Sequence, residues 1–462
     1  MFAVPGIIAL LTFIYLRPQE VSSSLRTLPF LHLFLALTVV GFAVDVGMRK
    51  IEPKISPQLR WAVLWLLWCI VTIVIKVPPD TMQYNATLLL ISFILFAVIA
   101  HSLQSFRSFG LVATVVVGLC LTLAAIGVHQ SAAPKQCVVL DTGVSANLGE
   151  GRPDGRGCEH FRECYDEEAE RNANYLCERI GLLGTTTIQG RVRYRGVLQD
   201  PNELALVISI GLPFLFALAI RRRKALWYLM TFAGAALMFY CVIKTQSRSG
   251  QLAFLAVLGV FFVKRYGKAR GFIVGAVLGI PVLLAGGRGG SSADESTVDR
   301  YEAWRAGLDM IRESPVIGVG EGMFTESHHL TAHNSYVLAG AELGFIGLFL
   351  WMMVLYVSFK MAYIGMNLPV EEGDDEAAEA QTWGTAMFAA LVGFSISMLF
   401  LSLTYHMLLW IYLGLAGAYY AVIRHRWPEL ELEIGLKDHG KVLAATLGII
   451  IAVSMVLRFK GF

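Results

Sequence analysis

Residues 335–362 form the stretch SYVLAGAELGFIGLFLWMMVLYVSFKMA, which decides the fold class. Glu342 and Lys360 are its only charged residues. An α-helix needs about 20 mostly apolar residues to cross the hydrocarbon core of a bilayer, and it satisfies its own backbone hydrogen bonds there. The stretch therefore predicts a membrane-spanning helix.

Similar apolar runs recur along the whole chain, which is 56% hydrophobic and only 16% charged. We predict an all-α, polytopic transmembrane bundle of 12–13 spans, built as one membrane domain over residues 1–462 because no internal repeat is visible. The first run is expected to be a retained helix, because no basic residue precedes it and no cleavage site follows it. The predicted spans lie near residues 2–16, 30–47, 59–77, 85–103, 109–128, 196–220, 225–243, 250–263, 271–285, 335–362, 383–402, 405–423 and 442–458.

Basic residues between the spans predict the topology, because Lys and Arg are enriched in cytoplasmic loops. Four connectors are basic: Arg49 to Arg60, Arg221 to Lys224, Lys264 to Arg270, and Arg424 with Arg426. Placing all four in the cytoplasm puts residues 129–195, 244–249 and 286–334 together on the outer side. The acidic segment 366–381 is then a cytoplasmic linker. A net charge of only +3 gives no support for nucleic-acid binding.

The loop 129–195 contains an even set of cysteines outside the apolar runs: Cys137, Cys158, Cys164 and Cys177. Two disulfides in an oxidising compartment are the favoured interpretation, with three connectivities open. Zinc binding is the alternative, although no pair has the two-residue spacing of a zinc knuckle.

The loop 286–334 is expected to carry an amphipathic helix over 299–312 on the outer membrane surface, because Trp304, Leu308 and Ile311 recur at helical spacing. Ser314-Pro315 should end it. The Gly/Ser-rich residues 286–298 before it are expected to be mobile. Gly318, Gly320 and Gly322 are interpreted as a turn rather than a nucleotide-binding loop, because no strand precedes them.

Arginines gather on the predicted outer side, where the positive-inside rule disfavours them. They are Arg191, Arg193, Arg195, Arg248, Arg300, Arg305 and Arg312. A guanidinium presents a planar fork of donors that suits phosphate, so an anionic ligand is one explanation. The alternative is that each arginine reaches the membrane interface or pairs with an acid such as Glu302 or Asp309.

His333 immediately precedes the 335–362 span, with Asn334 or Ser335 as its N-cap. The positive end of the helix dipole favours a neutral imidazole there, as a general base requires. A metal site with His329 is the alternative, but no carboxylate ligand is evident and we expect no metal. Glu203 and Glu342 lie just inside spans, where carboxylates are costly and are candidates for function.

Four motifs in order resemble the O-antigen ligase and polymerase superfamily. They are Arg195-Gly-Val-Leu-Gln-Asp-Pro-Asn202, Ser247-Arg-Ser-Gly250, Arg300-Tyr-Glu-Ala-Trp-Arg305 with Ser314-Pro-Val-Ile-Gly-Val-Gly320, and Ala332-His-Asn-Ser-Tyr336 with Glu342-Leu-Gly-Phe345. The long cysteine-bearing loop departs from the commoner pattern of this superfamily.

The resemblance implies a GT-C-type, inverting membrane glycosyltransferase of the bacterial inner membrane, with its active site facing the periplasm and no metal or other cofactor. The implied donor is an undecaprenyl-pyrophosphate-linked glycan, and the acceptor is a glycan or glycolipid. His333 would be the catalytic base. Arg195, Arg248, Arg300 and Arg305 would bind the pyrophosphate, supported by Asn202, Asn334 and Glu342.

The resemblance leaves open an O-antigen or exopolysaccharide polymerase, a ligase to lipid A core, and a protein O-oligosaccharyltransferase. The Tyr15-Leu-Arg-Pro-Gln-Glu20 opening favours a polymerase of a polysaccharide cluster. A secondary transporter is the alternative class, and it would require polar residues near the middle of the bilayer. Asp45, His101 and His406 are the candidates for that role.

Overall fold

The computed structural model describes residues 1–21, 25, 28–52, 54–140, 151–170, 172–222, 224–271, 273, 275, 277, 279 and 291–462. Within these ranges, nine helices are long and apolar enough to cross a membrane. The all-α, polytopic membrane class predicted from the sequence is confirmed. The nine helices are α3 (Phe30–Gly47), α4 (Leu59–Lys76), α5 (Pro79–Ser102), α6 (Phe106–Ala132), α8 (Pro201–Arg222), α9 (Ala225–Lys244), α14 (Ser335–Met366), α16 (Met407–Arg426) and α17 (Leu436–Lys460).

Three more of the predicted spans are helices that are shorter or more polar: α1 (Ala3–Leu16), α10 (Arg248–Tyr266) and α15 (Asp375–Ser397). The run predicted over 271–285 lies largely outside the described residues. Short helices α2 (Pro18–Val21) and α13 (Phe324–Ser327) occur in the connections.

Two predicted boundaries differ from the structure. Helix α15 begins at Asp375, inside the segment 366–381 that was predicted to be a linker, because the Asp374 side chain caps it and Asp375 and Glu376 favour its N-terminus. Helix α12 (Ser291–Glu313) begins before residue 299, where we predicted its start, and ends as predicted before Ser314-Pro315. Residues 286–290 of the predicted mobile stretch lie outside the described residues.

The chain divides into two compact units. Unit 1 comprises residues 1–9, 33–113 and 289–462, and unit 2 comprises residues 10–32 and 114–288. In unit 1, α14 packs against α4, α15 and α16, and α16 packs against α5. In unit 2, α8 packs against α9 and α10. The prediction of one membrane domain remains a prediction.

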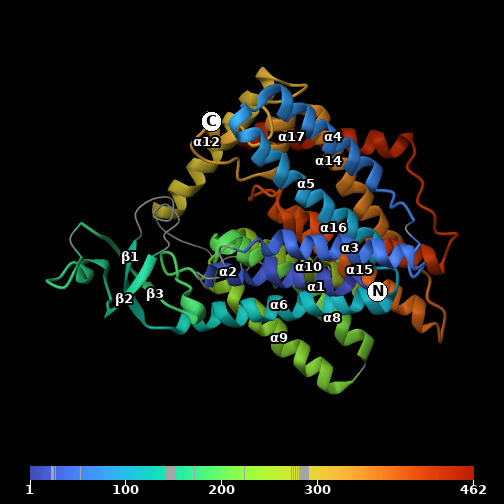
Figure 1. The fold of residues 1–462 in the computed structure, drawn as a ribbon, viewed down its shortest axis with the longest axis horizontal. Helices are drawn as coiled ribbons and strands as arrows, with labels where there is room; N and C mark the ends of the chain where they lie inside the picture. Colours follow the sequence, from blue (N-terminus) through green and yellow to red (C-terminus); the bar gives the residue numbers. More distant parts are fainter. Residues whose placement is uncertain are drawn as a thin grey trace. The chain divides into compact units, whose positions relative to one another are not determined.

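A small antiparallel sheet in unit 2 was not predicted. Strands β1 (Lys135–Leu140), β2 (Gly151–Gly157) and β3 (Asn174–Arg179) follow α6 along the chain (Figure 1). Within the sheet, β1 lies between β2 and β3. Two disulfides join this region, Cys137–Cys164 and Cys158–Cys177, which is one of the three connectivities that the sequence left open. The sulfurs of Cys137, Cys158 and Cys164 lie within 4.8 Å of one another, but disulfide sulfurs offer no thiolate to zinc.

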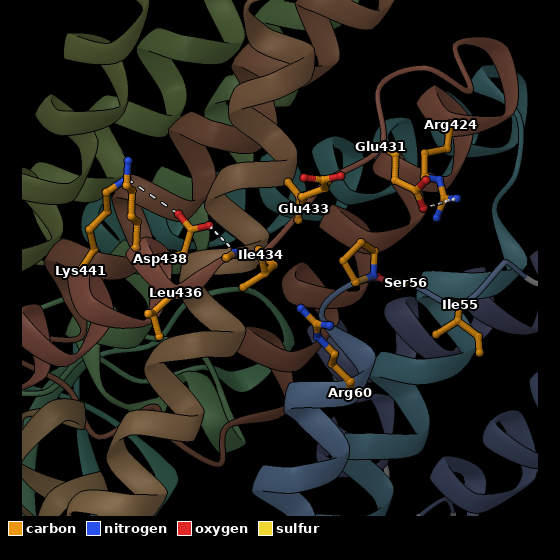
Figure 2. Close-up of a pocket in the computed structure, with 14 residues that line it drawn as sticks. Ile55, Ser56, Arg60, Arg424, Glu431, Glu433, Ile434, Leu436, Asp438 and Lys441 are labelled. Carbon is orange, nitrogen blue, oxygen red and sulfur yellow. Dashed lines mark hydrogen bonds and ion pairs between the residues drawn. The ribbon is translucent and has the colours of Figure 1, made fainter.

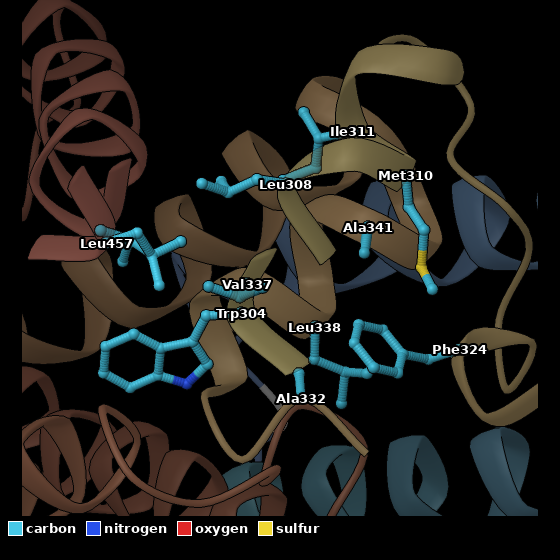
Figure 3. Close-up of a cluster of buried hydrophobic side chains, with 11 residues drawn as sticks. Trp304, Leu308, Met310, Ile311, Phe324, Ala332, Val337, Leu338, Ala341 and Leu457 are labelled. Carbon is cyan, nitrogen blue, oxygen red and sulfur yellow. The ribbon is translucent and has the colours of Figure 1, made fainter. Parts of the chain in front are cut away.

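The apolar face of α12 packs inside unit 1. Trp304, Leu308 and Ile311 are buried together with Val337 of α14 and Leu457 of α17, and Figure 3 shows these side chains in one cluster. The sequence correctly predicted which residues form the apolar face of this helix. In the structure this face packs against α14 and α17, and the position of the helix along the outer membrane surface stays a prediction.

Candidate functional site

The N-terminus of α14 holds His333 in an unusual backbone conformation. His333 has a φ of 47°, in the left-handed region that L-residues disfavour by about 1–2 kcal/mol. Its neighbours Ala332 and Asn334 are almost completely buried, whereas His333 is half-buried. The fold therefore fixes the residues on both sides and leaves the imidazole partly accessible. Backbone strain of this kind clusters at functional sites.

Two side chains fix this helix end. As predicted, Asn334 is the N-cap, and its Oδ1 accepts hydrogen bonds from the backbone N–H groups of Tyr336 and Val337 at 3.0 and 3.1 Å. The Ser335 hydroxyl donates to the Leu401 carbonyl at 2.6 Å and accepts from the Leu403 N–H at 2.8 Å. The segment after α15 therefore holds the start of α14 in place. This contact was not predicted from the sequence.

Helix α14 is broken at Gly344, and the loop after α12 fills the break. Gly344 has a φ of 65° and is non-helical. The carbonyls of Ala341 and Glu342 accept hydrogen bonds from the N–H groups of Val319 and Gly320 at 2.9 and 3.0 Å. Two of the sequence motifs, 314–320 and 342–345, are thus one structural element, and the positive φ values of Gly318, Gly320 and Gly322 agree with the predicted turn.

Two buried carboxyl groups meet beside this break. Glu342 is 2% exposed, and its Oε1 accepts a hydrogen bond from the Phe324 N–H at 3.1 Å. Glu321 of the loop is 6% exposed and interacts electrostatically with Glu342. Burial raises the pKa of Glu321 to about 7, and Asn85 partly offsets the shift. Glu321 was not predicted as a site residue, because it stands among glycines that indicate only a turn.

Replacing Gly344 by alanine is expected to destabilise unit 1 by more than about 2 kcal/mol, because the residue is in the left-handed region. A Cβ there would lie 2.2 Å from the Val316 carbonyl oxygen. Thermal unfolding of the purified protein in detergent measures the effect. Gly448→Ala on α17 is the matched control, because its Cβ would meet nothing within 4 Å and alanine favours a helix. Equal melting temperatures for the two variants would contradict the structural role of the break.

Glu321 predicts a pH dependence of stability. Its folded pKa of about 7 lies above the ordinary value of 4.5, so the folded state keeps a proton that the unfolded state releases. Between these values the free energy of unfolding should fall as pH rises, by up to about 1.4 kcal/mol per pH unit. The protein should melt at a higher temperature at pH 5.5 than at pH 8.

Glu321→Gln tests this dependence, because it removes the titrating group while keeping its shape. The difference in melting temperature between pH 5.5 and pH 8 should become smaller in this variant. Glu326→Gln, at an exposed position of the same loop, is the control and should behave as the wild type. If the pH dependence of the melting temperature is unchanged in Glu321→Gln, groups other than Glu321 cause it.

The arginines of α12 in unit 1 are not equivalent. Arg305 is exposed and has no ion pair among the described residues, whereas Arg300 is half-buried and has an interaction partner. Five residues along a helix correspond to about 140° of rotation, so these two side chains leave α12 on different sides. Arg312 pairs with Asp309 at 2.8 Å, which is the structural alternative considered for it.

In unit 2, the N-termini of α8 and α10 are joined through side chains. Asn202 Oδ1 accepts hydrogen bonds from Ser247 Oγ at 2.7 Å and from the Arg191 guanidinium at 3.3 Å. Ser247 also caps α10, because its Oγ accepts from the Gly250 N–H at 3.1 Å. Arg248 follows as an exposed first residue of α10. We call this group of Arg191, Asn202, Ser247 and Arg248 the corner. Its two positive helix ends and two arginines suit the binding of an anion.

Arg195 forms hydrogen bonds to backbone carbonyls of other segments, whereas Arg248 is exposed. Its terminal nitrogens donate to the carbonyls of Glu20, Leu183 and Gly184 at 2.6–2.9 Å. This side chain therefore connects the segment before α8 to the segment after α1 and to the loop around residues 183–184. The sequence assigned Arg195 to the pyrophosphate clamp and gave Arg191 no specific role, although Arg191 is the arginine that contacts Asn202.

The three polar residues considered for a transport pathway lie at helix ends with backbone partners. Asp45 Oδ2 accepts from the Ala3 N–H at 3.0 Å, His101 Nε2 from the Ser56 N–H at 3.2 Å, and His406 Nδ1 from the Leu408 N–H at 3.2 Å. These contacts support structural roles.

Comparison with known proteins identifies the central part of the chain. Residues 233–352 match the family described as O-antigen ligase. This stretch, the O-antigen ligase segment, is similar to that family. The resemblance predicted from the sequence motifs is thereby confirmed. The O-antigen ligase segment contains Arg248, Arg300, Arg305, His333 and Glu342, whereas Arg195, Asn202 and the disulfide-linked loop lie before it.

One curated relative extends the comparison. The exopolysaccharide production protein ExoQ of Rhizobium meliloti (strain 1021) is 29% identical to this chain, over 38% of this chain and 49% of ExoQ. The match thus spans about half the length of that relative.

Proposed function

We propose that this protein is an inner-membrane glycosyltransferase that moves an undecaprenyl-pyrophosphate-linked glycan to a sugar hydroxyl, with its active site on the periplasmic side. The observation that carries the proposal is the strained, half-buried His333 within the O-antigen ligase segment. The description of ExoQ as an exopolysaccharide production protein favours a polymerase over a ligase.

In the proposed reaction, the imidazole of His333 takes the proton of the acceptor hydroxyl as its oxygen attacks the anomeric carbon. The bond from this carbon to the pyrophosphate breaks, and undecaprenyl pyrophosphate leaves from the opposite face. The product therefore has an inverted anomeric configuration. Asn334, which caps the helix beside His333, supports the position of the base.

Charge develops on the leaving pyrophosphate, and stabilising it is the largest electrostatic task of the reaction. We assign this role to Arg248 and the adjoining corner of Arg191, Asn202 and Ser247, with Arg305 as a further cation. Arg195 is proposed to contribute by position rather than by direct binding, because its terminal nitrogens donate to three backbone carbonyls. The half-buried Arg300 is proposed to support donor binding from α12. Glu342 is proposed to position the loop that follows α12.

Deletion of the gene, followed by complementation with the wild-type gene, tests the function and separates its two forms. Single repeat units still transferred to their acceptor in the deletion strain would indicate a polymerase. Full-length chains that remain on the lipid carrier would indicate a ligase to lipid A core or to protein. Unchanged envelope glycans would contradict the proposal.

A further inference from the structure

Unit 1 contains a pocket of about 850 Å³ away from His333 and the break in α14 (Figure 2). It is formed where α4 begins, where α16 ends and where α17 begins. Arg60 and Arg424, from two of the four connectors predicted to be cytoplasmic, both line it. The structure thus places together two basic connectors that the topology assigned to the same side.

Several charges of the pocket already have partners. Arg424 pairs with Glu431 at 3.2 Å, and Asp438 pairs with Lys360 at 2.9 Å and with Lys441 at 3.8 Å. Asp438 also accepts a hydrogen bond from the Tyr356 hydroxyl at 2.6 Å. These paired groups line the pocket, and Asp438 balances only one of its two lysines.

Three charges have no ion pair among the described residues. Arg60 has only a contact with the face of the Trp61 ring, at 5.4 Å from its centroid. Lys437 is exposed, and the side chain of Glu433 has no hydrogen bond or ion pair. Figure 2 shows Arg60 and Glu433 directed into the same pocket. The uncommitted charges are therefore two cations and one carboxylate.

Large apolar side chains are exposed among these charges. Ile55 is 73% exposed and Leu436 is 88% exposed, and both line the pocket. Such exposure beside cations at helix ends is unfavourable in water but suits an amphipathic molecule at a membrane interface. Basic pockets between transmembrane helices on the cytoplasmic side are a known way to hold lipid headgroups.

We propose that this pocket binds a phospholipid whose headgroup carries both a phosphate and a primary ammonium group. Arg60 and Lys437 recognise the phosphate, since guanidinium and ammonium groups form charge-assisted hydrogen bonds with it. Glu433 recognises the ammonium group, and Ile55 and Leu436 contact the apolar part of the lipid. The opposite charges of the pocket favour this zwitterionic headgroup over one that is purely anionic.

Binding to the purified full-length protein in detergent tests the proposal, with native mass spectrometry and thermal unfolding as readouts. The added probes are phosphatidylethanolamine, phosphatidylglycerol, phosphatidylcholine and inorganic phosphate. The variants are Arg60→Ala/Lys437→Ala and Glu433→Gln. Lys268→Ala/Arg270→Ala removes two exposed basic residues of another connector and is the matched control.

Phosphatidylethanolamine should bind the wild type more tightly than the other two lipids. The double variant should lose about tenfold or more in affinity for every phospholipid, and Glu433→Gln should lose the preference for the ethanolamine headgroup. Equal stabilisation by inorganic phosphate would assign the site to the free ion and overturn the proposal. Stronger binding of phosphatidylglycerol to the wild type would overturn it as well, as would an equal loss in the Lys268→Ala/Arg270→Ala control.

Discussion

His333→Ala is expected to remove almost all glycan transfer while leaving the protein folded. General-base catalysis contributes about 10²- to 10⁴-fold to a rate, and the proposed mechanism has no second base for the acceptor hydroxyl. Complementation of the deletion strain with this variant should give the same envelope glycans as the deletion strain without any complementing gene. The abundance of the variant in the membrane and its melting temperature should stay close to those of the wild type, since the Asn334 cap and the Ser335 hydrogen bonds that hold this helix end remain.

The control for this experiment is His329→Ala. His329 lies four residues earlier in the same loop and is exposed, and its described contact is with the ring of His328. Its loss should leave glycan length and amount unchanged. If the two variants reduce transfer equally, the loop as a whole matters rather than one imidazole, and the alternative of a metal shared by His329 and His333 would regain support.

Arg248→Ala is expected to lower transfer by about 10²- to 10³-fold, which is typical of losing one preorganised group that stabilises developing charge. The side chain is exposed at the first residue of α10, where the helix dipole also favours the anion. The loss should appear mainly in the rate at saturating donor, because the charge on the pyrophosphate grows in the transition state. Arg248→Lys should recover part of the activity, because it keeps the charge but not the planar fork.

Arg265→Ala is the matched control for Arg248→Ala. It removes one arginine near the opposite end of the same helix, where Arg265 lies over the Tyr266 ring. This variant should keep normal activity. Arg195→Ala is a less direct test, because its guanidinium holds three backbone carbonyls and its loss should also lower the melting temperature. Normal transfer by Arg248→Ala would contradict the assignment of the corner to the pyrophosphate.

Sequence reasoning recovered those features that depend on local patterns. The apolar runs predicted helices such as α14, and the spacing of Trp304, Leu308 and Ile311 predicted the apolar face of α12. The N-cap of α14 is Asn334, one of the two residues that the sequence predicted for it. Each of these depends on residues within a few turns of one another. Local chemistry is sufficient for such features.

Features that depend on distant segments were not recovered. The sheet pairs β1 with both β2 and β3 although its strand sequence KQCVVL alternates poorly. Glu321 becomes buried only because α14 breaks at Gly344 and the preceding loop fills the gap. The partners of Arg195 lie at residues 20, 183 and 184, so no motif around it could show that its donors are occupied.

Glycan transfer by the purified protein tests the proposed mechanism directly. Lipid-linked glycan extracted from the deletion strain is the donor, a chelator is present, and released undecaprenyl pyrophosphate is measured together with the length and anomeric configuration of the glycan product. The proposed mechanism predicts release of one undecaprenyl pyrophosphate for each new glycosidic bond and inversion at the anomeric carbon. His333→Ala should give neither the released lipid nor the glycan product. Release that continues at the wild-type rate in His333→Ala, or retention of the anomeric configuration, would contradict it.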